Sequence, residues 1–119
     1  MYNVLVVGTH ILINAKAQSV DQLFDKQLFE DFILKTLVDF DLVQVGHVFH
    51  GFDQGGFTSV ICLTESHLAI HTWPEFNYYT CDVYLCDYTR RNYDLTVKLA
   101  NAIKLYFNSY DINEKIINR

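Results

Sequence analysis

The stretch TSVICLTESHLAIHTWPEFNYYTCDVYLC, residues 58–86, contains three short segments rich in β-branched and aromatic residues. We expect strands over residues 58–63, 66–73 and 78–86. Pro74 would end the second strand, because proline has no N–H to donate to a β-ladder. Strands joined by such short connections pair antiparallel. This stretch therefore predicts the centre of an antiparallel sheet.

Further elements are expected on both sides of that stretch. The apolar run at residues 3–13 is typical of a buried strand, and residues 42–50 alternate in polarity as another strand would. We also expect the tail, NEKIINR at residues 113–119, to form a short edge strand.

Two amphipathic helices are predicted by apolar residues at helical spacing. The first spans about residues 20–38 and begins at Ser19 and Gln22, a pair typical of a capping box. The second spans about residues 93–108. The element order predicts a two-layer α+β sandwich, a mostly antiparallel sheet with two helices on one face, with residues 1–119 forming a single domain. The uncovered sheet face, if apolar, would be a dimer interface.

Composition disfavours several classes of partner and location. The 119 residues carry a formal charge of −5, and the nearest approach to a basic cluster is Arg90–Arg91, so nucleic acid binding is not expected. Three cysteines without a CxxC motif favour a reducing cytoplasm over a disulfide framework. The first 14 residues lack a basic leader and are interrupted by polar residues, so we expect neither a signal peptide nor a membrane span.

The histidines do not predict a metal site. His67 and His71 share a face of the expected strand, but they would lie ~13 Å apart along it and could not bind one ion together. His47 and His50 would fall on opposite faces of their strand. We expect no metal.

Several other polar and aromatic residues are candidates for a catalytic or binding site, and each also has a purely structural interpretation. Ser66 lacks a GxSxG elbow and, taken alone, is a hydroxyl at the start of a strand. Cys86 ends its strand beside Asp87, so we expect it to be more exposed and reactive than Cys62 and Cys81, which we expect to be small buried hydrophobes.

Phe52, Trp73 and Glu75 lie where a strand meets a polar loop. The two aromatic residues would stack on a planar ligand or else belong to the core. Glu75 would accept hydrogen bonds from ligand hydroxyls or else be a solvated turn residue.

The segment ESHLAIHTWPE, residues 65–75, closely resembles the self-cleavage region of the small prokaryotic S-adenosylmethionine decarboxylases. These are pyruvoyl-dependent enzymes of spermidine synthesis. GTHILI at 8–13, HGF at 50–52 and CDVYLC at 81–86 resemble further segments of the same family. The resemblance covers most of residues 8–87.

The resemblance implies that the protein makes its own cofactor. The Ser66 hydroxyl would attack the carbonyl of Glu65, and elimination from the resulting ester would cut the chain. The products would be a β chain of residues 1–65 and an α chain that begins with a pyruvoyl group formed from Ser66. His71 matches the histidine that transfers protons during this processing.

The resemblance also implies roles in the mature enzyme. The pyruvoyl carbonyl would form a Schiff base with the substrate amine and act as an electron sink for decarboxylation. Cys86 matches the general acid, Phe52 and Trp73 match aromatic residues that flank the adenine, and Glu75 matches the carboxylate that binds the ribose. The family typically forms homodimers of cleaved αβ protomers or larger assemblies, and some site residues, Phe52 among the candidates, come from the partner subunit.

Some features depart from the family's pattern. Thr58 stands where the family has a serine implicated in processing, although a hydroxyl is kept. The loop GFDQGG, residues 51–56, lacks the family's Pro-Tyr and leaves the substrate open. The alternatives are a pyruvoyl-dependent decarboxylase of ornithine or arginine, and a regulatory homologue that never cleaves.

Strand alternation places Ser66 and His71 on opposite faces. A bend or turn at Glu65–Ser66 would be needed if both side chains reached one site, and strain at that bond would make sense for self-cleavage.

Overall fold

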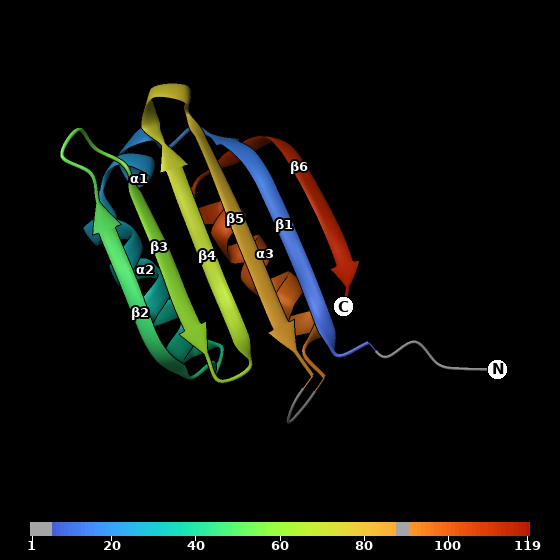
Figure 1. The fold of residues 1–119 in the computed structure, drawn as a ribbon. Coiled ribbons are helices and arrows are strands. Elements are labelled where there is room, and N and C mark those ends of the chain that lie inside the picture. Colours follow the sequence, from blue (N-terminus) through green and yellow to red (C-terminus); the bar gives the residue numbers. More distant parts are fainter. Residues whose placement is uncertain (1–5, 88–90) are drawn as a thin grey trace.

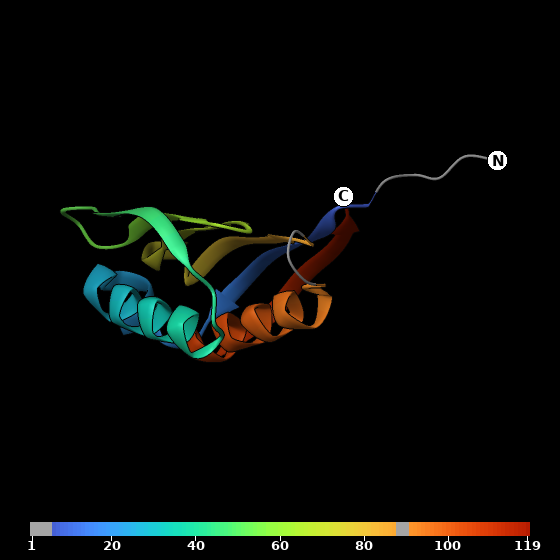
Figure 2. The same ribbon diagram turned by 90° about the horizontal axis from the view of Figure 1, so that it is seen from below.

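The computed structural model describes residues 6–87 and 91–119 and contains one six-stranded antiparallel sheet with its helices on one face (Figures 1 and 2). The strands are β1 (Gly8–Ala17), β2 (Gln44–Gly51), β3 (Phe57–Leu63), β4 (Ser66–Trp73), β5 (Tyr78–Cys86) and β6 (Ser109–Asn118). The helices are α1 (Val20–Phe24), α2 (Lys26–Asp39), α3 (Tyr93–Tyr106) and the 3₁₀ helix η1 (Pro74–Phe76). The spatial order β2-β3-β4-β5-β1-β6 confirms the predicted two-layer α+β sandwich.

The prediction of one helix over residues 20–38 was wrong. Asp25 has an extended backbone, with φ −102° and ψ 108°, and it separates α1 from α2. Its carboxylate accepts the main-chain N–H groups of Gln27 and Leu28 at 2.8 and 3.4 Å, as an N-cap residue does. The Ser19 side chain makes no capping hydrogen bond, so the predicted capping box is wrong as well.

The two terminal strands also differ from expectation. β1 begins at Gly8 rather than residue 3 and continues to Ala17, while the expected start at residues 3–5 lies outside the described residues. The C-terminal strand β6 has 10 residues, longer than expected, and it pairs along β1 at the edge of the sheet.

The hydrophobic core lies between the sheet and the helices (Figure 2). Aromatic rings fill its centre: Phe29 of α2 stacks on Phe57 of β3 at 5.1 Å, and Tyr79 of β5 stacks on Phe107 at 4.3 Å between ring centroids. Four large buried rings from four parts of the chain therefore hold the helices on the sheet.

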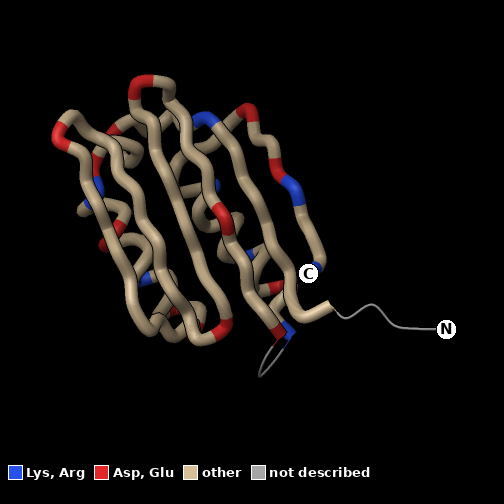
Figure 3. The backbone as a smooth tube through the Cα atoms, viewed as in Figure 1, with Lys and Arg blue, Asp and Glu red and all other residues tan. Residues whose placement is uncertain are grey.

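The opposite face of the sheet is open. Tyr78, Thr80, Asp82, Tyr84 and Cys86 alternate with buried residues along β5 and lie on this face, as predicted. Charged residues gather at the strand ends and loops, and the middle of the sheet carries few of them (Figure 3).

An apolar row crosses the open face. Val48, Val60 and Ala69 are register partners on β2, β3 and β4. Val48 is 64% exposed and Val60 is 45% exposed, which is unusual for valines in the middle of strands.

Among the helices in residues 6–87 and 91–119, none is long and apolar enough to cross a membrane.

Candidate functional site

The candidate residues from the sequence fall into two groups at opposite ends of the sheet (Figure 1). The loop end, beside the β2–β3 loop and η1, holds Phe52, Thr58, His71, Trp73 and Glu75. The turn end, at the β3–β4 turn, holds Glu65, Ser66 and Cys86. The two groups are joined by β4, and five residues of extended strand separate Ser66 from His71 by roughly 16 Å.

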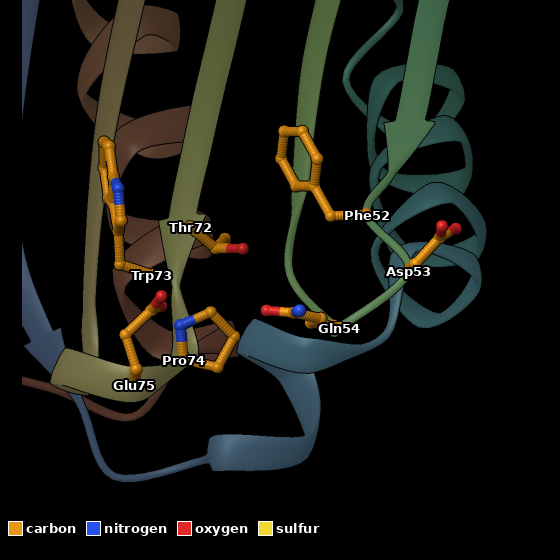
Figure 4. Close-up of a pocket in the computed structure, with 8 residues that line it drawn as sticks. Phe52, Asp53, Gln54, Thr72, Trp73, Pro74 and Glu75 are labelled. Atoms are coloured by element: carbon orange, nitrogen blue, oxygen red, sulfur yellow. The ribbon is translucent and has the colours of Figure 1, made fainter.

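The loop end contains a pocket of about 560 Å³. Figure 4 shows the rings of Phe52 and Trp73 on opposite sides of the opening, with the side chains of Glu75 and Gln54 below them in that view. The three residues singled out for ligand binding therefore line one cavity. Its full lining is Phe52, Asp53, Gln54, Gly55, Thr72, Trp73, Pro74 and Glu75.

The shape of the pocket depends on the glycine pair in the β2–β3 loop. Gly55 and Gly56 have φ values of +95° and +89°. A Cβ at Gly55 would lie 2.0 Å from the Phe24 ring, so the loop packs directly on α1. The sequence marked this loop by its glycines but could not show which helix it contacts.

Thr72 is a pocket residue that the sequence did not single out. It is buried, and its hydroxyl donates to the Leu23 carbonyl at 2.7 Å and accepts the Phe57 N–H at 2.9 Å. These bonds tie the end of β4 to α1 and β3 beneath Trp73. A threonine in a strand carries no signal for such a role in the sequence.

Thr58 and His71 form a pair on the open face beside the pocket. They are register partners on β3 and β4, and Thr58 Oγ1 lies 2.9 Å from His71 Nδ1. The His71 ring centroid is 6.3 Å from that of Trp73. Two residues expected to assist processing are thus brought together with the aromatic wall of the pocket, far from Ser66.

Ser66 has an unusual backbone at the turn end. Its φ is +121°, although it is not a glycine. The other four non-glycine residues with positive φ in the described chain are Asp or Asn with φ between 49° and 58°, the left-handed region those residue types tolerate. A two-residue hairpin loop commonly places positive φ inside the loop, but here it falls on Ser66 after Thr64–Glu65. The structure thus has a turn before Ser66 and an unfavourable φ at Ser66, although this turn does not bring Ser66 and His71 to one site.

The orientation of Ser66 also agrees with expectation. Its register partners are Leu63 and Leu85, which are buried beneath the helices, whereas the partners of His71 lie on the open face. Ser66 and His71 therefore lie on opposite sides of the sheet.

The main chain of Cys86 is hydrogen-bonded to the peptide group that precedes Ser66. Its main-chain N–H donates to the Glu65 carbonyl oxygen at 2.9 Å, one pair beyond the end of the β4–β5 ladder. The Glu65 side chain is only 7% exposed although it belongs to a tight turn. The turn therefore has a buried carboxylate next to the exposed Thr64 and the half-buried Ser66.

Asn92 is the residue of this end that the sequence missed. It is fully buried, and its Nδ2 donates to Glu65 Oε1 at 3.0 Å and to the Cys86 carbonyl at 2.7 Å. An asparagine directly before a helix is typical of an ordinary N-cap, so nothing in the sequence pointed to a contact 27 residues away.

The cysteines differ in part from expectation. Cys81 is buried, as predicted, and burial raises the pKa of its thiol. Cys62, also expected to be buried, is exposed, because it lies on the open face of β3 near the edge of the sheet. Cys86 is half-buried, so it is less exposed than Cys62.

Within residues 6–87 and 91–119, no three His, Cys, Asp or Glu side chains are grouped closely enough to hold a metal ion. The predicted basic pair includes Arg90, which lies outside the described residues.

Known proteins similar to this chain agree with the motif resemblance. A protein of Archaeoglobus fulgidus named S-adenosylmethionine decarboxylase proenzyme is 26% identical over 106 residues, 89% of this chain and 88% of that protein. A protein of Hyperthermus butylicus named arginine decarboxylase proenzyme is 35% identical over 85 residues, 69% of this chain. This chain spans 59% of the length of that second relative.

The fold and the family model extend the likeness over nearly the whole chain. The crystal structure of the adenosylmethionine decarboxylase from Aquifex aeolicus matches with a TM-score of 0.85 and 24% identity, covering 98% of this chain and 92% of that one, which establishes the common fold. The family model described as S-adenosylmethionine decarboxylase matches residues 9–119. The chain therefore belongs to the S-adenosylmethionine decarboxylase family, whose members are pyruvoyl-dependent decarboxylases.

Proposed function

We propose that this protein is a proenzyme that cuts itself between Glu65 and Ser66 and then decarboxylates S-adenosylmethionine, supplying the aminopropyl donor for spermidine synthesis. The observation that carries the proposal is the φ of +121° at Ser66. A hydroxyl-bearing residue is held in an unfavourable backbone conformation at the bond where family resemblance places the cleavage.

Self-cleavage begins with attack of Ser66 Oγ on the Glu65 carbonyl carbon. The serine proton passes to a base, the C–N bond breaks as the nitrogen is protonated, and an ester replaces the peptide bond. Removal of the Ser66 Cα proton then expels the Glu65 carboxylate by β-elimination. The elimination leaves dehydroalanine at position 66, and water hydrolyses its imine tautomer to a ketone with release of ammonia. The products are a β chain of residues 1–65 and an α chain of residues 66–119 that begins with this ketone.

The residues around Ser66 fit a pyruvoyl group formed there. Ser66 has the side-chain hydroxyl that such a group requires, and the Cys86 N–H on the Glu65 carbonyl places Cys86 beside the bond to be cut. When present, the group supplies an electron sink for loss of CO₂ from an amine-bearing substrate. Cys86, half-buried at the end of β5, would hold the proton that replaces the carboxyl group.

The pocket at the loop end fits the adenosine part of the substrate. Two aromatic rings on opposite sides of an opening suit a planar base, and a carboxylate such as that of Glu75 accepts hydrogen bonds from ribose hydroxyls. A volume of about 560 Å³ is within the range of small-molecule sites.

The separation of the two ends implies a site shared between two copies of the chain. The open face carries the apolar row of Val48, Val60 and Ala69, whose two valines are exposed, and such a row suits packing of a second sheet about 10 Å away. A twofold axis running across the strands near this row would set the loop end of one protomer against the turn end of the other. Thr58 and His71 would then lie against the turn end of the partner subunit, and the Ser66 side chain, which lies on the helix side of its own sheet, would have to turn toward the open face to meet them.

A second candidate substrate is arginine. It is favoured by the relative named arginine decarboxylase proenzyme, which is 35% identical, against 26% for the relative named for S-adenosylmethionine. A guanidinium also stacks between aromatic rings, so the pocket walls alone do not distinguish the two.

Intact-mass measurement tests the proposal directly. Purified protein should contain two chains, residues 1–65 and 66–119, the second beginning with a ketone that borohydride reduces. Ser66→Ala should remain one chain of 119 residues. Splitting of Ser66→Ala at the same bond would refute the mechanism, and a wild-type chain that stays whole would favour the non-cleaving homologue.

Release of CO₂ from S-adenosylmethionine, ornithine and arginine, each labelled at the carboxyl carbon, then identifies the substrate. We expect activity with S-adenosylmethionine, with Trp73→Ala and Glu75→Ala raising KM. Activity with arginine or ornithine alone would overturn the assignment of substrate while leaving self-cleavage intact.

A further inference from the structure

Asn92 holds together the two main-chain segments that meet at the bond proposed for cleavage. Its Nδ2 donates to Glu65 Oε1 and to the Cys86 carbonyl oxygen, and Cys86 in turn donates its N–H to the Glu65 carbonyl. The three residues form a closed set of contacts: Asn92 to Glu65, Asn92 to Cys86, and Cys86 to Glu65.

Asn92 is itself fixed through its main chain. Its N–H donates to Asp87 Oδ1 at 2.8 Å, and its carbonyl accepts both the Thr96 hydroxyl at 2.6 Å and the Thr96 N–H at 2.8 Å. Thr96 is fully buried in α3. The amide of Asn92 is therefore presented to Glu65 and Cys86 from a rigid support.

The side chain of Asn92 does not cap the helix that follows it. It is the N-cap residue of α3, where an asparagine oxygen ordinarily accepts an N–H of the first turn, yet it makes no capping bond. Its Oδ1 is buried with no hydrogen-bond partner among the described residues, which is a costly arrangement for an amide. Both amide hydrogens are used at the turn end instead.

The proposed attack of Ser66 places negative charge on the oxygen that this arrangement holds. As the new C–O bond forms, the carbonyl electron pair moves onto the Glu65 oxygen, and the serine proton leaves to a base. The main-chain N of Cys86 lies 2.9 Å from this carbonyl oxygen before the attack, so its N–H already donates to the atom on which the negative charge develops.

We infer that Asn92 is a positioning residue for self-cleavage: it fixes Glu65 and Cys86 so that the Cys86 N–H stays on the Glu65 carbonyl oxygen as that oxygen becomes charged. This rests on the proposed function. It assigns the stabilising contact to the main chain of Cys86, so Cys86→Ala, which keeps the N–H, leaves this contact in place.

The test follows the splitting of freshly purified proenzyme with time in Asn92→Ala and Asn92→Asp. In the aspartate variant a carboxylate oxygen replaces the Nδ2 donor, so it faces Glu65 Oε1 and the Cys86 carbonyl oxygen with no hydrogen to donate. Asn101→Ala, on the exposed face of the same helix, is the matched control. We expect both Asn92 variants to split at least about tenfold more slowly than wild type, and the control to split at the wild-type rate.

Two further measurements separate positioning from folding. Unfolding temperature is compared for Asn92→Ala with Ser66→Ala and for Ser66→Ala alone, where neither chain splits. Hydroxylamine, which cleaves esters, is added to the single Asn92 variants. With a slowed first step no ester accumulates, so hydroxylamine should not accelerate their cleavage. A purely structural role would lower the unfolding temperature and leave the folded fraction splitting normally.

Glu65→Ala removes the hydrogen bond between Asn92 and Glu65 and leaves the start of α3 unchanged. This variant tests the same role if the Asn92 variants do not fold. It should also slow splitting. Folded Asn92 and Glu65 variants that split at the wild-type rate would overturn the positioning role. A wild-type chain that never splits would overturn the proposed function itself.

Discussion

Ser66 combines a reactive hydroxyl with a backbone conformation that serine rarely adopts. A non-glycine residue outside the favoured regions costs on the order of 1–3 kcal/mol and persists only where its surroundings enforce it. Here the Thr64–Glu65 turn, the β4–β5 ladder and the Cys86–Glu65 hydrogen bond enforce it together. Breaking the Glu65–Ser66 bond would release this constraint, so the strain favours the products of cleavage.

The strain at Ser66 can be measured without any chemistry. Ser66→Gly and Ser66→Ala both lack the hydroxyl and stay uncleaved, but only glycine adopts a φ of +121° freely. We expect the glycine variant to be more stable than the alanine variant by about 1 kcal/mol, the strain relieved minus the entropy that glycine loses on folding. Urea denaturation of the two variants gives the difference.

Ser59 provides the control, since it is buried within β3 and is not among the residues with positive φ. There the order should reverse, with Ser59→Gly less stable than Ser59→Ala by about 0.5–1 kcal/mol. A glycine variant at position 66 that is no more stable than alanine would argue against strain at the proposed cleavage bond.

At the scale of elements, the break between α1 and α2 depends on one side chain. The Asp25 carboxylate accepts two N–H groups from the first turn of α2, whereas Ser19 caps nothing. Asp25→Ala should therefore lower the free energy of unfolding by about 1 kcal/mol, while Ser19→Ala should change it by less than about 0.5 kcal/mol. Equal losses at the two positions would mean that the capping box predicted from sequence exists after all.

The sequence predicted the elements whose signals are local. β3, β4 and β5 were placed to within a residue, because alternation, Pro74 and short connections mark them directly. The break at Asp25 was missed because apolar residues continue at helical spacing on both sides of it. The full length of β6 depends on pairing with β1, which lies about 100 residues earlier and leaves no local trace.

The candidate site could be predicted from the sequence where a local motif marks its residues, and not where tertiary contacts define them. The residues of the ESHLAIHTWPE segment were found by motif, and the structure gathers Phe52, Trp73 and Glu75 around one pocket. Asn92 was not found, because its importance comes only from its contacts with Glu65 and Cys86, which tertiary structure creates.

At the scale of the whole molecule, the candidate residues lie in two groups that one protomer does not bring together. The pocket and the Thr58–His71 pair lie at one end of the sheet, and Ser66 and Cys86 lie at the other. The open face between them has features of an interface. Valines are exposed along its central row, and burial lowers the pKa of the His10 ring below its usual value.

Mixed dimers test whether two copies complete each other's sites. Cys86→Ala impairs the turn end and Trp73→Ala impairs the loop end, so each homodimer should decarboxylate poorly at substrate concentrations well below the raised KM of Trp73→Ala. In a heterodimer of the two variants, one site combines both defects, whereas the other combines intact Cys86 from one protomer with intact Trp73 from its partner. Heterodimers isolated with two different affinity tags should thus recover about half of the wild-type activity, one working site of two.

The same heterodimer discriminates against a site built within one protomer. If Cys86 and Trp73 served the same protomer, every site in the mixture would carry one defect, and activity would stay at the level of the two homodimers. Mixing Cys86→Ala with Ser66→Ala is the matched control, because both changes lie at the turn end and no arrangement of two protomers restores an intact site. Recovery in the first pair and not in the second would require the two ends to meet across the open faces of the sheets.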